Sequence, residues 1–368
     1  MAIRASLHRK TFHFAFAART SRGAMRERVS WFMRMVDGLG TEGWGECAPL
    51  PGLSPELKSE QFESEIADAV NALNALSLQP EQVPNSLAEL SSLLTQKLPV
   101  LRQQSALLFA METALLDLGN GGTRTLFPNP FSQGQSLPIN GLIWMGGLDS
   151  MLQQIEIKIR DGYRCIKLKV GGLDFEKECD VLQYVRRKYF RETITIRLDA
   201  NGAFKPEDAL YKLRELAKFQ IHSIEQPLKP GASQLPDLCR ESPIPVALDE
   251  ELIGVAPSGR AELLQRIKPA FLVLKPSLHG ALSGCRDWIQ LAEQSGIGWW
   301  ITSALESNLG LNAIAQFTSQ YPVSLPQGLG TGQIYTDNIA SPLEVSPDGL
   351  LSLNPQETWD LATLQTDH

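Results

Sequence analysis

Residues 163–172 read YRCIKLKVGG, an apolar run that carries two lysines and ends in two glycines. A run of this length with such a boundary is typical of a strand. Residues two apart on a strand point to the same face, so Lys167 and Lys169 are side-by-side neighbours. On a solvated edge this pairing would indicate no function. Burying two ammonium groups is costly, so a buried pair would indicate that function requires it. The rest of the chain decides between these interpretations.

Short β-rich runs of this kind recur after about residue 135, with helical patterns between them. Eight can be counted: LPINGLIWMG, YRCIKLKV, ITIRLDAN, IHSIEQP, IPVALDE, AFLVLKP, GIGWWITS and YPVSLPQGLGTG. Strands that alternate with helices predict parallel βα units, and eight units fit a closed α/β barrel. A doubly wound open sheet is the competing architecture, but no GxGxxG follows the first of these runs. The sequence therefore predicts a (β/α) barrel over residues 131–340.

The first third of the chain has a different order. Strands are predicted at 2–17, 29–36 and 42–48, and helices at about 55–76, 86–97 and 104–119. Strands followed by helices predict a separate α+β module. We expect this module to span residues 1–130 and the tail, about 341–368, to complete it.

Charge and cysteine usage restrict the class of protein. The 34 Lys+Arg and 41 Asp+Glu give a formal charge of −7, so no electrostatic footprint for nucleic acid or anionic membrane is present. The five cysteines lie far apart and are typical of reduced thiols. No apolar run approaches a membrane span, and the N-terminus is too polar for a signal peptide. We expect a soluble, cytoplasmic protein.

Four consecutive predicted strands end in a charged residue: Asp199, Glu225, Asp249 and Lys275. The spacings are 26 (225 − 199), 24 (249 − 225) and 26 (275 − 249), about one βα unit each. In a parallel barrel, such strand ends lie side by side at the C-terminal rim, where barrel active sites are found.

Three carboxylates at this rim would repel one another unless a cation joined them. Oxygen ligands without His or Cys suit a hard ion, Mg²⁺ before Mn²⁺ or Ca²⁺, rather than Zn²⁺. Each acid alone could equally cap the following helix, but three in succession favour a metal site. The run Asp249-Glu250-Glu251 leaves open which acid binds, and we expect it to be Asp249, the last residue of its strand.

The lysines suit the removal of a proton alpha to a carboxylate. The metal and a cationic lysine would stabilise the enediolate, and a neutral lysine would take the proton. The ordinary pKa of lysine, about 10.4, is too high for this role. A second ammonium two residues away and a nearby metal would lower it, which explains the pair Lys167 and Lys169.

The motifs KLK at 167–169, DAN at 199–201, EQP at 225–227, DEE at 249–251 and LKPS at 274–277 resemble the enolase superfamily, specifically its muconate-lactonizing enzyme subgroup. GWGECAPLPG at 43–52 and the predicted helix ALLFAMETALLDL at 106–118 resemble that family's capping domain and its junction with the barrel. The resemblance covers nearly the whole chain. It implies an enolase-type modified barrel with an N-terminal α+β capping domain.

Three further segments narrow the resemblance: SRGAMRERVSWF at 21–32, SALESNLGLNAIAQ at 303–316 and QGLGTGQIYTDNI at 327–339. They resemble the subgroup's dehydratases of menaquinone biosynthesis, which implies syn dehydration of 2-succinyl-6-hydroxy-2,4-cyclohexadiene-1-carboxylate to o-succinylbenzoate. GIGWWITS lacks the histidine base of the mandelate racemase subgroup, and QGLGTGQ lacks the Asp-x-Asp of many dipeptide epimerases. His222 is expected to be structural, and His279 is a loop residue of unknown role.

The resemblance implies a role for each charged residue. Asp199, Glu225 and Asp249 would hold Mg²⁺, with Mn²⁺ as a substitute, and the metal would bind the substrate's ring carboxylate. Lys169 would abstract the alpha proton and then protonate the departing hydroxide. Lys275 would stabilise the enediolate from the other face of the ring. Two residues would support this set from just outside it: Asn201 and Glu250.

Other residues would bind the substrate, which is a small-molecule carboxylate. Thr302 and Ser303 are candidates for binding the succinyl carboxylate. Arg26 and Arg28, together with residues 49–54, would belong to loops that close over the substrate.

Three alternatives remain open. An N-acylamino acid racemase or a cycloisomerase of the same subgroup needs the same acids and lysines. A Schiff-base aldolase using Lys275 would leave the three carboxylates unexplained. A binding protein on a barrel scaffold would have no reason to keep the buried lysines.

Overall fold

Seven parallel strands form the central sheet of the structure, a computed structural model that describes residues 1–20, 23–190 and 193–365. Its strands follow one another in sequence order around the sheet. They are β5 (Gly141–Ile143), β6 (Cys165–Lys169), β7 (Thr195–Asp199), β8 (Ser223–Glu225), β9 (Val246–Leu248), β10 (Phe271–Leu274) and β11 (Gly298–Ile301). A sheet in which every strand neighbours the next along the chain requires a helical crossover between each pair, as predicted.

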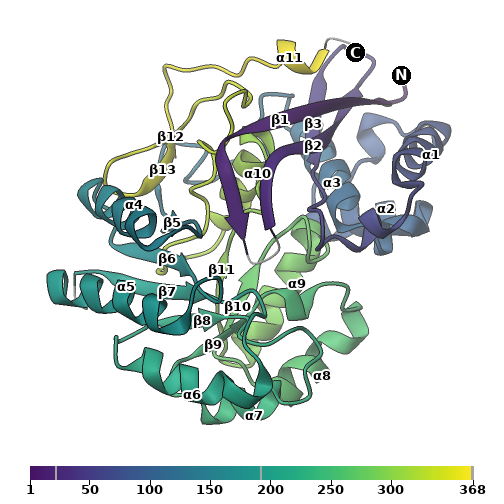
Figure 1. Cartoon of the computed structure of the whole chain (residues 1–368). Helices are drawn as coiled ribbons and strands as arrows, with labels where there is room; N and C mark the ends of the chain where they lie inside the picture. The colour runs from purple at the N-terminus through teal and green to yellow at the C-terminus, as the bar shows by residue number, and fades with distance from the viewer. Residues whose placement is uncertain (21–22, 191–192, 366–368) are drawn as a thin grey trace.

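The crossover helices lie on the outside of this curled sheet (Figure 1). They are α4 (Leu148–Arg160), α5 (Phe175–Lys188), α6 (Pro206–Ala217), α7 (Leu235–Glu241), α8 (Pro257–Ile267), α9 (Ala281–Gln294) and α10 (Asn308–Thr318). Each buries an apolar stripe, as α4 does with Met151, Ile155 and Ile159 at four-residue spacing.

Residues 326–328 close the sheet into a barrel. The amide of Gln327 donates to the carbonyl of Pro138 at 2.8 Å, and that of Gly328 donates to the carbonyl of Ile301 at 2.8 Å. Single parallel bridges also join Ile139 to Gln327 and Thr302 to Gly328. The predicted eighth strand, YPVSLPQGLGTG, is therefore reduced to these bridges, because its prolines and glycines weaken a regular strand. The predicted (β/α) barrel is confirmed.

The N-terminal module packs three antiparallel strands on helices. The strands are β1 (Arg4–Thr20), β2 (Gly23–Val36) and β3 (Glu42–Cys47). The helices are α1 (Phe62–Ala75), α2 (Leu87–Lys97) and α3 (Ser105–Gly119), with short 3₁₀ turns η1 (Pro55–Lys58), η2 (Pro80–Gln82) and η3 (Pro99–Arg102). Helix α3 lies so close to β3 that a Cβ on Gly45 would come within 2.0 Å of the carbonyl oxygen of Ala110. The helix predicted at 55–76 is divided into η1 and α1.

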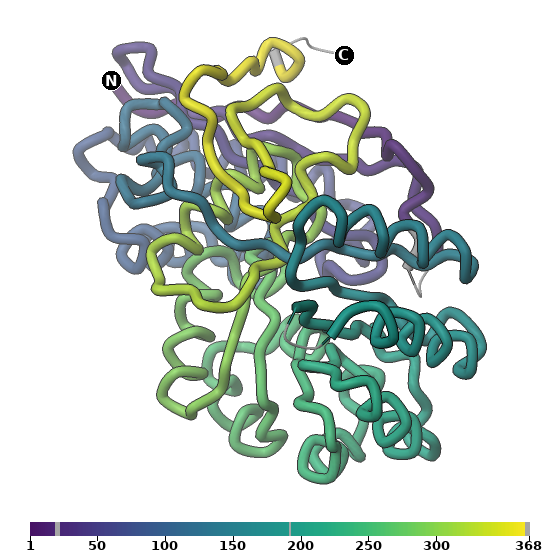
Figure 2. Tube along the Cα trace, turned by 90° about the vertical axis from the view of Figure 1, so that its left-hand side faces the viewer, coloured from purple at the N-terminus to yellow at the C-terminus, as the bar shows by residue number. Residues whose placement is uncertain are grey.

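The C-terminal tail contacts both parts of the molecule. β12 (Leu343–Val345) and β13 (Leu350–Leu353) form a small antiparallel sheet with β4 (Leu137–Pro138) at the start of the barrel. α11 (Ala362–Gln365) packs on β1, and Figure 2 shows the tail crossing from one part to the other. The predicted boundary near residue 130 remains a prediction. None of the described helices is both long and apolar enough to cross a membrane.

A buried carboxylate of the N-terminal module caps a barrel helix. Glu112 of α3 accepts the amide N–H groups of Leu282 and Ser283 at 3.0 and 3.3 Å, and the Ser283 hydroxyl at 2.5 Å. These donors belong to the first turn of α9, whose amides have no partner within the helix. Burial raises the pKa of Glu112 to about 7, although these hydrogen bonds oppose the shift.

We expect this carboxyl group to make stability depend on pH. The pKa of Glu112 in the folded state lies above the ordinary value of 4.5. The contribution of this group to the free energy of unfolding is therefore complete below pH 4.5 and is lost as the pH rises through about 7. Between about pH 5 and 8, ionisation of Glu112 should lower the free energy of unfolding of the wild type by up to about 3 kcal/mol. Glu112→Gln, which cannot ionise, should not show this decrease. Denaturant unfolding of both proteins across this range measures it. Identical pH profiles would contradict the prediction.

Candidate active site

The strand register brings three charged side chains into one row. Lys169 pairs with Asp199 between β6 and β7, and Asp199 pairs with Glu225 between β7 and β8. Glu225 then pairs with Ala247, so Asp249, which directly follows β9, lies two residues further along the chain. This stagger is the shear that closing a sheet into a barrel requires. The acids at successive strand ends therefore meet inside the rim.

The lysines contact these carboxylates directly. The ammonium of Lys167 lies 2.5 Å from Glu225 Oε2 and 3.0 Å from Asp199 Oδ2. Lys169 lies 3.0 Å from the same Asp199 oxygen. Lys275 approaches from the opposite side, where it pairs with Asp249 and lies 3.9 Å from Glu225 Oε1. All three lysine side chains are buried or nearly so, and the structure brings them together with the three acids.

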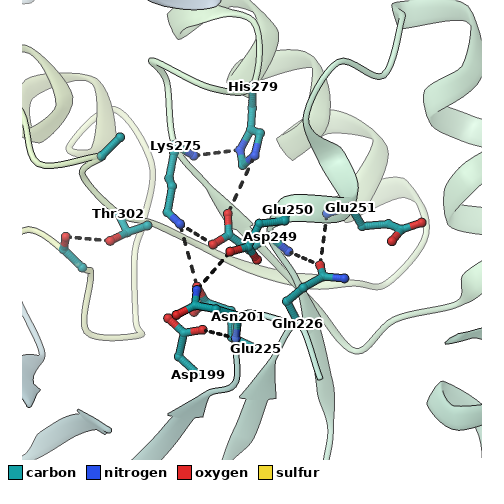
Figure 3. Close-up of polar contacts among 12 residues, drawn as sticks. Asp199, Asn201, Glu225, Gln226, Asp249, Glu250, Glu251, Lys275, His279 and Thr302 are labelled. Atoms are coloured by element: carbon teal, nitrogen blue, oxygen red, sulfur yellow. Dashed lines mark hydrogen bonds and ion pairs between the residues drawn. The ribbon is translucent and has the colours of Figure 1, made fainter. Parts of the chain in front are cut away.

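Neighbouring side chains orient this cluster. Asn201 accepts from the Lys169 ammonium at 2.7 Å and donates to Glu250 at 3.0 Å. Figure 3 shows Lys275 and His279 on one side of Asp249, with Asn201 on the other. His279 Nδ1 accepts from the backbone amide of Lys275 at 2.9 Å, and its Nε2 lies 3.9 Å from Asp249 Oδ1. Burial lowers the pKa of His279 to about 4, so the ring is neutral near pH 7.

His279 is a site residue that sequence reasoning missed. The only signal was its position four residues after Lys275 in LKPSLHG. His222, by contrast, directly precedes β8 and so lies at the opposite end of that strand from Glu225. Its ring packs on Phe271 with centroids 5.2 Å apart and contacts the Ser223 hydroxyl at 3.0 Å.

Burial and charge act against each other on the pKa values of the cluster. Burial lowers the pKa of Lys167, but Asp199 and Glu225 outweigh it and raise the pKa above the ordinary value. Burial also disfavours ionised Asp199, yet Lys167 and the other lysines lower its pKa. Burial and the charge of Asp199 raise the pKa of Glu225 well above the ordinary value. The charge of the lysines therefore outweighs the effect of burial at Asp199 but not at Glu225.

The oxygen atoms of this cluster fit a divalent cation. Glu225 Oε1 and Asp249 Oδ1 are buried and have no hydrogen-bond partner among the described residues, which is costly for a carboxylate. In the described ranges, no three His, Cys, Asp or Glu side chains already surround one point as ligands. The ammonium groups of Lys167 and Lys275 contact the carboxylates instead. A hard cation would compete with them for the same oxygens.

A cavity of about 340 Å³ opens onto this cluster. The three lysines, Asp199 and Asn201 line its floor. Its walls include residues that had not been predicted to bind substrate: Leu142, Trp144, Leu305, Gly330 and Thr331. Aliphatic and aromatic walls around a few charged groups are typical of a site for a small organic molecule.

The residues predicted to bind substrate have different positions. Thr302 and Ser303 both line the cavity. The Thr302 hydroxyl donates to the Gly328 carbonyl at 2.9 Å, and the Ser303 hydroxyl lies 2.6 Å from that of Thr331. The predicted loop at 49–54 reaches the cavity through residues 50–53.

The two arginines do not line this cavity. Arg26 is exposed, whereas Arg28 is buried and donates to the carbonyls of Ala48 and Ala304. The neighbouring residues 23–25 do line the cavity. Of the predicted loop, Ser21 and Arg22 lie outside the described residues. Arg28 therefore contacts two backbone segments, and the role of either arginine in binding substrate remains a prediction.

The sequence has a family match and a close full-length relative. The model of the enolase C-terminal domain-like family matches residues 150–352. A curated o-succinylbenzoate synthase from Desulfotalea psychrophila is 43% identical over 365 residues, which are 95% of this chain and 98% of that protein.

Solved structures agree with this similarity. The crystal structure of MenC from Desulfotalea psychrophila matches with a TM-score of 0.83 and 40% identity, and the match covers 96% of this chain and 100% of that one. A dipeptide epimerase from Cytophaga hutchinsonii, complexed with Mg and D-Ala-L-Val, matches with a TM-score of 0.81. It is 21% identical, and the match covers 99% of this chain and 98% of the epimerase. At that identity the similarity concerns the fold alone.

Proposed function

The chain belongs to the enolase C-terminal domain-like family, and from that premise we propose that it dehydrates 2-succinyl-6-hydroxy-2,4-cyclohexadiene-1-carboxylate to o-succinylbenzoate, a step of menaquinone biosynthesis. The observation that carries this function is the 43% identity to a curated o-succinylbenzoate synthase along nearly the whole of both chains. A match over this length spans the capping module as well as the barrel. The chain is a carbon–oxygen lyase.

Asp199, Glu225 and Asp249 would hold one Mg²⁺, for which Mn²⁺ could substitute. The unpartnered oxygens of Glu225 and Asp249 support this assignment. The ion would supply a Lewis acid that draws electron density from the substrate's ring carboxylate and so acidifies the alpha carbon. The Mg-bound epimerase with the same fold also supports this choice of metal.

Lys169 takes the alpha proton. Asn201 holds its ammonium group at 2.7 Å, and because the Asn201 amide donates to Glu250, its oxygen is kept toward the lysine. A syn elimination removes the proton and the hydroxyl from one face of the ring. A single lysine on that face can therefore accept the proton and return it to the departing hydroxide.

Lys275 contributes positive charge from the other side of the cluster. It is buried, and the carboxylates of Asp249 and Glu225 outweigh the effect of burial and raise its pKa, so it stays protonated. A fixed cation there stabilises the negative charge that develops on the substrate after proton removal. His279 holds the backbone of Lys275 through its amide.

A direct assay distinguishes this function from that of related enzymes. Purified protein with Mg²⁺ should convert the cyclohexadiene substrate with a kcat/KM at least about 10-fold above that for racemisation of N-succinyl amino acids. The same preparation serves for both reactions, so differences in folding do not affect the ratio. A higher kcat/KM for racemisation would make the chain an N-acylamino acid racemase on the same scaffold.

A further inference from the structure

The residues that join β11 to α10, called here the 303–307 segment, form one wall of the cavity. Ser303, Ala304 and Leu305 line it. Leu305 has a φ of +66°, in the left-handed region that residues other than glycine rarely adopt. Such a backbone persists only where the surrounding structure holds it. The contacts that hold this segment come largely from outside the barrel strands.

Arg28 provides the first of these contacts. It lies on β2 of the capping module and is only 3% exposed. One guanidinium nitrogen donates to the carbonyl of Ala304, and another donates to the carbonyl of Ala48, which follows β3. The guanidinium therefore joins the cavity wall to the capping sheet. The planar fork of arginine suits two acceptors at once, which a lysine ammonium would not match.

Glu46 provides the second contact, from β3. Its carboxylate accepts the Ser307 amide at 3.0 Å, the Ser307 hydroxyl at 2.6 Å and the Gly310 amide at 3.0 Å. The hydroxyl of Ser30 on β2 donates to the same carboxylate at 2.8 Å. A Cβ on Gly310 would lie 2.8 Å from Glu46 Oε2, so the close approach of this carboxylate to α10 requires a glycine at position 310. A carboxylate at this helix N-terminus is favoured by the unpaired amides and the helix dipole.

Tyr335 provides the third contact. Its hydroxyl donates to the carbonyl of Leu305 at 2.6 Å. Its ring packs against Phe12 and Phe14 of β1, with centroids 5.0 and 4.8 Å apart. The strained residue is therefore held by a side chain that is itself anchored on the capping sheet.

We propose that Arg28, Glu46 and Tyr335 are positioning residues for substrate binding: they hold the 303–307 segment in shape without lining the cavity themselves. The segment forms a wall beyond the lysines and carboxylates. The three residues therefore set the affinity for the part of the substrate that those charged groups do not hold. This inference rests on the proposed function, because dehydration supplies its kinetic measurement.

The test compares two carboxylates of the capping module that each cap a barrel helix. Glu46→Ala removes the cap on α10, and Glu112→Ala removes the cap on α9, whose preceding residues 276–280 do not line the cavity. Tyr335→Phe removes only the hydroxyl on the Leu305 carbonyl. It should fold even if the alanine variants do not. Glu46→Gln keeps an acceptor for the Ser307 and Gly310 amides and tests rescue.

We expect Glu46→Ala to raise KM at least about 10-fold while kcat changes less than about 3-fold, and Tyr335→Phe to raise KM about 3-fold. Glu112→Ala should leave KM within about 2-fold of the wild type, and Glu46→Gln should recover most of the loss. Calorimetric titration with o-succinylbenzoate should show the same order in Kd.

Two results would overturn the proposal. One is an unchanged KM in both Glu46→Ala and Tyr335→Phe. The other is an equal rise in Glu46→Ala and Glu112→Ala, which would show only that the modules must dock. Failure of the proposed function is distinct, because the wild-type protein itself would then not dehydrate the substrate.

Discussion

Lys169→Arg is expected to lower kcat for dehydration by about 10³-fold or more, whereas Lys275→Arg should lose only about 10-fold. Arginine keeps the positive charge but cannot accept a proton near neutral pH. Lys169 lies beside Asn201 and Asp199 at the cavity floor, in the position of the proposed base. Lys275 pairs with Asp249 from the opposite side, where the proposed mechanism requires only its charge.

The measurement is single-turnover dehydration, so that product release does not mask the chemical step. Both variants should still bind Mg²⁺, which calorimetry can check separately. If Lys169→Arg dehydrates as fast as Lys275→Arg, Lys275 is the proton acceptor. Lys167 and Lys169 would then serve only to hold charge near Asp199.

Removal of divalent metal is expected to abolish activity, and added Mg²⁺ should restore it. Without a cation, burial and the charge of Asp199 raise the pKa of Glu225 well above the ordinary value, and a cation beside Glu225 would favour its ionised form. Mg²⁺ should therefore bind the folded state and raise Tm by several degrees at about 100 times its Kd. Full activity after exhaustive chelation would remove the metal from the mechanism.

Glu225→Gln tests the same point without an activity assay. The variant should lose most of the Mg²⁺-dependent rise in Tm and should be at least as stable as the wild type without metal, because a buried acid among acids is removed. Glu56→Gln is the matched control, since Glu56 is also a buried acid with a pKa raised by burial but lies in the capping module. A large loss of stability in Glu225→Gln with intact Mg²⁺ binding would mean that Glu225 is structural.

The strand ends could be predicted from the sequence because their signal is local. Each barrel strand is a short apolar run, and its final charged residue is adjacent to it in the chain. Asp199 and Glu225 were expected side by side from the 26-residue step alone, and the register pairs them directly. The barrel could be predicted from these regular intervals, whereas the family was indicated by the resemblance of the motifs at the strand ends. The metal and lysine roles remain predictions that the substitutions above test.

Other features depended on contacts between distant segments. Arg28 belongs to a polar stretch that is typical of a surface loop, yet it is buried because the carbonyls of Ala48 and Ala304 converge on it. His279 gains its role only when the turn after β10 brings it back to the amide of Lys275.

The sequence by itself determined the barrel, its order of strands and the residues at their ends, because periodicity and spacing are properties of neighbouring residues. Only the tertiary structure decided which side chains face the cavity and which hold its walls. The strained Leu305 shows the reason: its conformation depends on a hydroxyl 30 positions away, on Tyr335. A hydrogen bond between segments so far apart leaves no pattern in either segment, since each partner satisfies a group that only folding brings near.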